Sequence, residues 1–165
     1  MPATQVLQTY LDAMSDHVLV GDFDSYQSGV ELPFHLVTTD SSVVVTTHED
    51  LRAGFDHYRV MLASQVVTAY IRIVNLAVLL DDRLISGHYT THIISGGTRI
   101  VAPFPSQIVL RDHGAQGWRA ASITNGAQNM RWPMDRIDVR PPSNVDPDPS
   151  TPIHRPGQEA DHAKD

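Results

Sequence analysis

Four long β-rich segments in succession, joined by short turns, most constrain what this chain can fold into. They span residues 67–80, 83–95, 98–111 and 117–128. The turns between them fall at Asp81-Asp82, at Gly96-Gly97 and at residues 112–117. Connections this short join antiparallel neighbours, because a parallel pair needs a crossover of about a dozen residues or more. The segments therefore predict an antiparallel meander.

Three amphipathic helices are expected before this meander. The first runs from Thr4 to Val20, with apolar residues three and four apart on one face. Asp22 is placed to cap a short second helix. Thr47, with Asp50 three residues later, resembles a capping box that opens the third helix. The apolar side of that third helix is expected to pack on the sheet.

A hairpin of two strands is expected between the second and third helices. Residues 31–47 are β-branched and aromatic, with an interruption at residues 40–42. Pro33 should lie near the start of the first of these strands, and Pro103 and Pro105 should break the third long strand. Helices and strands that are grouped rather than alternating indicate an α+β fold.

The C-terminal part of the chain has a different composition from the rest. Residues 141–165 hold six of the eleven prolines and almost no large apolar residues. Such a segment buries too little surface to offset the entropy of ordering it. We therefore expect one domain over residues 1–132 and a flexible or extended tail over residues 133–165.

Composition excludes several function classes. The chain has 12 basic and 19 acidic residues, a net charge of −7, and Lys164 as its only lysine, so no basic stripe for nucleic acid is expected. The absence of cysteine excludes disulfides, a thiol nucleophile and cysteine-ligated metals. Neither a glycine-rich phosphate loop nor zinc-ligand spacing is present, so no cofactor and no metal are expected.

The location of the protein is inferred from two missing signals. The N-terminal residues 1–14 lack the basic region and apolar run of a secretory signal. No apolar stretch approaches the roughly 20 residues that span a bilayer. We therefore expect a cytoplasmic protein without membrane contacts.

Over residues 4–130 the order of elements resembles the nuclear-transport-factor-2-like (SnoaL-like) superfamily. The stretches that carry the resemblance are residues 10–26, 47–58 and 110–125. The resemblance implies a cone-shaped, curved antiparallel sheet packed by about three helices, as in cystatin-like folds. It also implies a pocket between sheet and helices, and a homodimer formed through the outer sheet face.

Members of this superfamily include isomerases, dehydratases, cyclases, epoxide hydrolases, ligand binders and structural oxygenase subunits. In the ketosteroid isomerases the catalytic aspartate lies just before a Pro-Phe pair, and Leu32 takes that place here. The acid of their oxyanion hole corresponds to Ser106, and their first-helix tyrosine to Met14. Glu31 is adjacent, but strand alternation aims it at the opposite face. Ketosteroid isomerase activity is therefore not expected.

His88 and His92 are the candidate catalytic pair. On a strand, four residues span roughly 13 Å, so the two cannot share a metal ion, but they face the same side with Thr90 between them. The resemblance places this face in the pocket, where two imidazoles would act as acid and base near neutral pH. The opposite face, with Ile85, Tyr89 and Ile93 among its residues, has more apolar character, which leaves an outer position for the histidines open.

Several further residues are candidates for the pocket. The residues expected to line it are Tyr10, Met14, Tyr26, Leu32, Phe34, Phe55, Tyr58, Thr90 and Ser106. Arg59 and Arg72 would suit an anionic ligand, although a lone arginine usually lies in solvent. Asn125 and Asn129 are placed either to reach the pocket mouth or to cap strand ends.

Three functional hypotheses remain. The first is a homodimeric binder of a small, largely apolar molecule. The second is a cofactor-free lyase, isomerase or cyclase that uses the histidines. The third is a structural subunit that docks a partner through its sheet, as oxygenase small subunits do. An apolar pocket with a few orienting polar groups favours the first.

Overall fold

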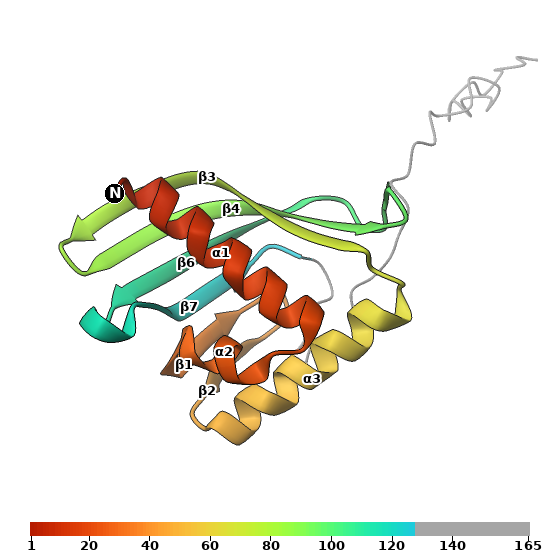
Figure 1. Ribbon diagram of the computed structural model, residues 1–165, viewed down its shortest axis with the longest axis horizontal. Coiled ribbons are helices and arrows are strands. Elements are labelled where there is room, and N and C mark those ends of the chain that lie inside the picture. The colour runs from red at the N-terminus through yellow and green to blue at the C-terminus, as the bar shows by residue number, and fades with distance from the viewer. Residues whose placement is uncertain (128–165) are drawn as a thin grey trace, which may run out of the picture.

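The computed structural model describes residues 1–127 and contains one curved sheet with three helices on one face (Figure 1). The α+β class expected from the sequence is confirmed. The expected tail at residues 133–165, and Asn129, lie outside the described residues. None of the helices within residues 1–127 is long and apolar enough to cross a membrane.

The three helices begin where the sequence predicts. They are α1 (Ala3–Val20), α2 (Phe23–Ser28) and α3 (His48–Ser64). Asp22 caps α2 by accepting a hydrogen bond from the Ser25 backbone N–H at 3.0 Å. Thr47 caps α3 in the same way, since its Oγ1 accepts from the Asp50 N–H at 3.1 Å. Each cap satisfies a backbone donor that the first turn leaves unpaired.

The strands form a mixed sheet. They are β1 (Val30–Val37), β2 (Ser42–Val45), β3 (Ala69–Asp81), β4 (Leu84–Ser95), β5 (Thr98–Arg99), β6 (Phe104–Asp112) and β7 (Trp118–Asn125). The order is β2-β1-β7-β6-β4-β3, with β5 paired to β4. The expected meander is present. The β1–β7 pair is parallel, however, because α3 and the whole meander intervene between these two strands.

Prolines interrupt the sheet at the expected places. The third long strand is broken into the short β5 and β6, with Pro103 between them and Pro105 as the second residue of β6. Pro33 lies in β1 and follows a cis peptide bond, and the pairing of β1 with β7 shifts register between Val30 and His35. Proline cannot donate to a ladder, so it is tolerated at such irregular points.

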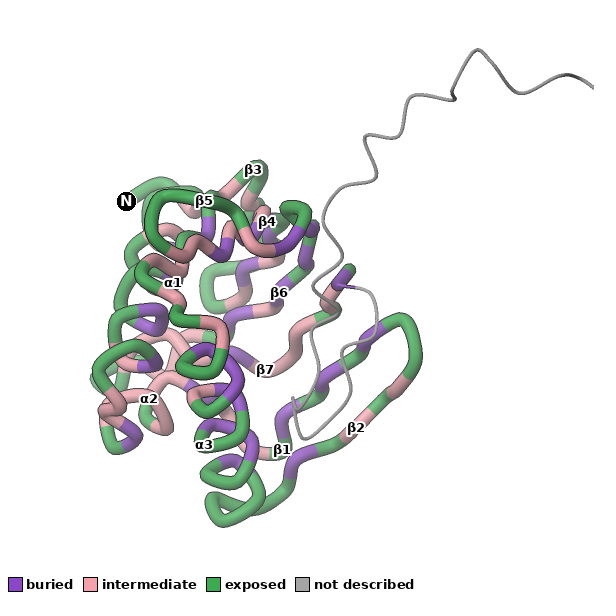
Figure 2. The backbone as a smooth tube through the Cα atoms, turned by 90° about the vertical axis from the view of Figure 1, so that its right-hand side faces the viewer, coloured by how far each residue is buried: buried purple, intermediate pink, exposed green. Residues whose placement is uncertain are grey.

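The hydrophobic core lies between the sheet and α1. Along β4, Ile85 and Ile93 are fully buried while His88 is exposed, so alternate residues face the helices. A Cβ added at Gly87 would overlap the side chain of Leu7, which shows how closely α1 approaches β4. Figure 2 shows buried and exposed residues alternating along β1 and β6 in the same manner. Full burial of each large aliphatic side chain contributes about 1.5–3 kcal/mol.

The opposite face of the sheet carries exposed apolar residues on its β3 edge. Ile71, Ile73, Leu76 and Val78 are between 43% and 56% exposed. Across the β3–β4 ladder they pair with His92, Thr90, His88 and Ser86, respectively. We call this side the outer face of the sheet, and the side that the helices cover the inner face.

Candidate functional site

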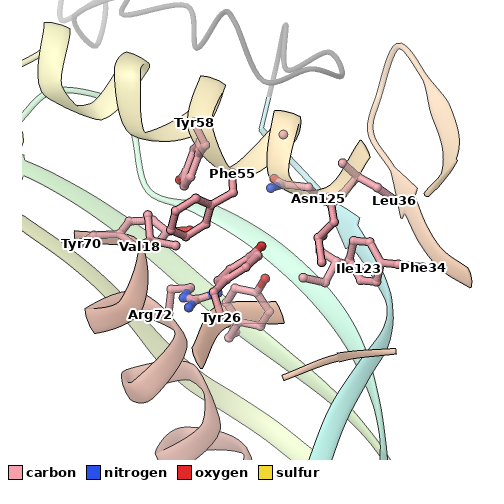
Figure 3. Close-up of a pocket in the computed structure, with 13 residues that line it drawn as sticks. Val18, Tyr26, Phe34, Leu36, Phe55, Tyr58, Tyr70, Arg72, Ile123 and Asn125 are labelled. Atoms are coloured by element: carbon pink, nitrogen blue, oxygen red, sulfur yellow. The ribbon is translucent and has the colours of Figure 1, made fainter. Parts of the chain in front are cut away.

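A pocket opens between the inner face of the sheet and the three helices (Figure 3). Its cavity volume is about 70 Å³. The helices contribute Val18, Tyr26, Leu51, Gly54, Phe55 and Tyr58. The sheet contributes Phe34, Leu36, Tyr70, Arg72, Tyr89, Ile123 and Asn125. The lining is thus mainly aromatic and aliphatic, with few polar groups.

The aromatic rings of the lining pack on one another. The Tyr26 and Phe55 centroids are 4.8 Å apart, and Phe23 packs edge-on against Phe55 at 5.3 Å. On the other side of the pocket, Tyr58 and Tyr70 meet at 5.7 Å with an interplanar angle of 70°. Contacts of this geometry fix each ring by its neighbour. The walls of the pocket are therefore held by contacts between its own side chains.

Arg72 is the one lining residue with a formal charge among residues 1–127. It is only 7% exposed. Its Nε donates to Ser15 Oγ and its Nη2 to the Leu11 carbonyl, both at 2.9 Å. These bonds from α1 hold the guanidinium in place. The tyrosine rings beside it are Tyr70, with its centroid 5.1 Å away, and Tyr89, at 5.9 Å.

No carboxylate within residues 1–127 pairs with Arg72. The ion pairs of this part of the chain involve Asp22, Glu31 and Asp56 instead. Burial alone lowers the pKa of Arg72, but the surrounding tyrosines, Tyr70 first, raise it above the ordinary arginine value. The side chain is therefore a buried cation whose neighbours are neutral.

Tyr26, Tyr58 and Tyr89 of the pocket are neutral at physiological pH. Burial raises the pKa of Tyr26 to about 12, with the nearby Arg72 opposing this shift. The pKa values of Tyr58 and Tyr89 are also raised, again chiefly by burial. A protonated phenol donates a hydrogen bond and is a poor proton acceptor. These hydroxyls are thus suited to orienting a ligand.

Acid–base groups are missing from the described lining. A proton-transfer enzyme needs a positioned base close to the reacting atom. The pocket formed by residues 1–127 has no histidine, aspartate or glutamate on its wall. This part of the chain also has no group of three His, Asp or Glu residues placed to hold a metal ion.

The expected pocket residues divide into two groups. Tyr26, Phe34, Phe55 and Tyr58 line the pocket, whereas Tyr10, Met14, Leu32, Thr90 and Ser106 do not. The Tyr10 hydroxyl donates to the Gly29 carbonyl at 2.7 Å. Met14 is a core residue and Leu32 is half-buried beside the core. The second group was expected there because single-sequence patterns give the buried side of an element but not the position of its cavity.

His88, Thr90 and His92 lie on the outer face, away from the pocket. The pairing of β4 with β6 runs without a shift from Leu84 to Thr91, so strict alternation sends these side chains opposite to Tyr89. Thr90 Oγ1 donates to Asn75 Oδ1 at 2.9 Å. The pocket position that the family resemblance implied for the pair is therefore corrected to the alternative position. Neither imidazole lines this pocket, and His88 instead lines a second pocket together with Ser106 and Asn125.

Ser106 and Glu31 are positioned by the same alternation. Ser106 is buried on the inner face opposite Tyr89. Glu31 faces the other way, as expected, and contacts Arg111 and, at 2.8 Å, His113 Nε2. No carboxylate of β1 therefore reaches the pocket from the position next to Leu32.

The most polar part of the site, formed by Tyr70, Arg72 and Tyr89, was not predicted as a unit from the sequence. Tyr70 and Tyr89 are not among the expected pocket residues, and Arg72 is expected either to bind an anionic ligand or to lie in solvent. The available signal was the alternation of Tyr70, Arg72 and Val74, which places these three residues on one face of β3. The face of β4 that carries Tyr89 pairs with this face of β3, so the four residues lie on the same side of the sheet.

Comparison with known proteins supports the fold and leaves the activity open. No family model matches the sequence, and no curated protein matches it. A domain of unknown function with a cystatin-like fold from Nostoc punctiforme is 12% identical, with 75% of this chain and 76% of that chain covered and a TM-score of 0.55.

Two further solved structures are similar. A nuclear-transport-factor-2-like protein of unknown function from Shewanella oneidensis is 9% identical, covers 74% of this chain and 98% of its own, and has a TM-score of 0.57. A ketosteroid isomerase-like protein from Erwinia carotovora is 13% identical, covers 74% and 94%, and has a TM-score of 0.51. The chain therefore has the nuclear-transport-factor-2-like, cystatin-like fold that its sequence resembles.

Proposed function

We propose that this protein binds a small, largely apolar molecule in the pocket and that it does so as a homodimer. The observation that carries the proposal is the aromatic pocket, whose rings pack on one another around an open cavity. Ligand sites combine an apolar wall with a few polar groups that fix orientation. Here Arg72, Asn125 and the tyrosine hydroxyls supply those polar groups.

The volume of the cavity favours a compact ligand. At about 70 Å³ it exceeds the roughly 10–15 Å³ that one water needs, but it is below the roughly 300–1,000 Å³ of drug-sized sites. A single aromatic ring with one polar substituent is therefore the largest class of ligand that we propose for this pocket.

The homodimer is supported by the exposed apolar residues on the outer face of β3. Ile71, Ile73, Leu76 and Val78 form a continuous apolar row on that edge of the sheet. Contiguous exposed apolar side chains commonly mark a protein interface. Sedimentation of the wild type should give a dimer, and Leu76→Lys should give a monomer. A wild type that sediments as a monomer at all concentrations would contradict the dimer.

Ligand binding is tested by NMR titration with one-ring aromatic compounds, both neutral and anionic. Shifts should appear at pocket residues such as Tyr26 and Phe55. Ile123→Trp should block them by filling the cavity, whereas Val60→Trp, on an exposed part of α3, should leave them unchanged. If no compound shifts the pocket signals of the wild type, the proposed function is wrong.

A further inference from the structure

We infer that the pocket selects apolar molecules that carry a carboxylate, which forms an ion pair with Arg72. This inference rests on the proposed function and specifies its class of ligand. A charged group in a protein interior is normally paired, because losing its hydration is costly. Arg72 is buried, yet its hydrogen-bond partners within residues 1–127 are neutral: Ser15, the Leu11 carbonyl and the Tyr89 hydroxyl.

The guanidinium keeps donors for a ligand. Arginine has five N–H groups, and the two bonds to α1 use one on Nε and one on Nη2. A third N–H group bonds to the Tyr89 hydroxyl, so two hydrogens on the terminal nitrogens remain. Two hydrogens are enough to bond to the two oxygens of a carboxylate.

Neutral tyrosines strengthen the preference for an anion. Tyr26 and Tyr89 lie beside Arg72, and phenols that stay protonated donate hydrogen bonds without competing as counter-charges. A neutral ligand group would leave the cation unpaired, whereas a carboxylate would pair with it. The selectivity for a carboxylate thus follows from the buried cation and from the lack of a carboxylate partner for it within residues 1–127.

The rest of the wall requires that the anion be attached to an apolar body. Figure 3 shows Arg72 at one end of the pocket and Phe34, Leu36 and Ile123 gathered at the other. A carboxylate at Arg72 would therefore direct its ring or chain toward these side chains. A free inorganic anion would pair with the charge and leave the apolar end unfilled.

Benzoate and benzamide are suitable probes, because they have nearly the same shape and differ in charge. Their dissociation constants would be measured by NMR titration at neutral pH, with inorganic phosphate as a third probe. The wild type should bind benzoate at least about tenfold more tightly than benzamide, a preference that corresponds to about 1.4 kcal/mol. Phosphate should bind more weakly than benzoate. Equal or tighter phosphate binding would overturn the requirement for an apolar body.

Arg72→Met should remove the preference for benzoate while benzamide binding stays within about threefold. Arg59→Met is the matched control, since Arg59 bonds to the Val18 carbonyl and does not line the pocket. The Arg59→Met control should keep the wild-type ratio of the benzamide and benzoate dissociation constants. Arg72→Lys, which keeps the charge, should retain part of the preference for benzoate.

The outcomes separate the two proposals. If neither benzoate nor benzamide binds the wild type, both the proposed function and this inference fail. If the two bind equally well, or if Arg72→Met keeps the preference, the inference is overturned and the apolar binding site stands. Should Arg72→Met fail to fold, the wild-type ratio and the Arg72→Lys ratio decide the matter.

Discussion

The inner and outer faces of the sheet differ in the exposure of their charged and titratable groups, which are buried on the inner face and more exposed on the outer face. On β4, Tyr89 faces inward and is 3% exposed, while its neighbour His88 faces outward and is exposed. On β3, Arg72 faces inward between exposed Ile71 and Ile73. The inner face thus buries a cation among aromatic rings, and the outer face puts imidazoles beside exposed aliphatic side chains. The family resemblance implied the reverse for the histidines, whereas the apolar pattern of the strand left the outer position open.

The largest difference between the faces should be in stability. Ile93→Ala on the inner face should lower the free energy of unfolding by about 2–5 kcal/mol, because it opens a cavity in a fully buried site. Leu76→Ala on the outer face, where Leu76 is 56% exposed, should cost much less in the monomer. Urea denaturation of both variants at low protein concentration measures the two losses in the free energy of unfolding. Equal losses would show that the outer face is as packed as the inner one.

The second difference concerns alkaline pH. Burial raises the pKa of Tyr26 to about 12, against about 10 in the unfolded chain. The neutral form is therefore favoured by folding, so its contribution to stability is complete below about pH 10. That contribution is lost as the pH rises toward 12, with a slope of at most about 1.4 kcal/mol per pH unit for one tyrosine.

Absorbance of the phenolate and urea denaturation at pH 9 to 12 would follow this loss together. Tyr26→Phe should reduce the steepness of the decline, because it removes one of the groups that titrate. A decline equally steep in the wild type and in Tyr26→Phe would show that Tyr26 ionises as it does in the unfolded chain.

The smallest expected effect is that of the outer histidines on ligand binding. His88→Ala and His92→Ala should each leave the benzoate dissociation constant within about twofold of the wild type, because neither side chain lines the pocket. Titration of each variant in parallel with Phe55→Ala gives the contrast. A loss at either histidine as large as that at Phe55 would mean that the two faces are coupled.

Much of the architecture could be predicted from the sequence because it depends on local rules. The caps at Asp22 and Thr47 follow from their side chains, and the division of the third long strand follows from Pro103 and Pro105. The α+β class follows from the grouping of helices and strands. The parallel pairing of β1 with β7 could not be predicted from local rules, because it joins segments at opposite ends of the domain.

The site was harder to predict than the fold. Its helix residues Tyr26, Phe55 and Tyr58 are recognisable from apolar spacing. Whether Arg72 is buried depends on α1 crossing β3, which brings Ser15 and Leu11 to the guanidinium from more than fifty residues away in sequence. Spacing along one strand carries no information about such a contact.

The central claim is that ligand binding belongs to the inner face and centres on Arg72. The most direct measurement is an NMR titration with benzoate that follows the Arg72 Nε–H signal together with the ring protons of His88 and His92. The account predicts a saturable shift of the Arg72 signal with unchanged histidine rings. A shift confined to the histidine rings, with the Arg72 signal unmoved, would contradict it.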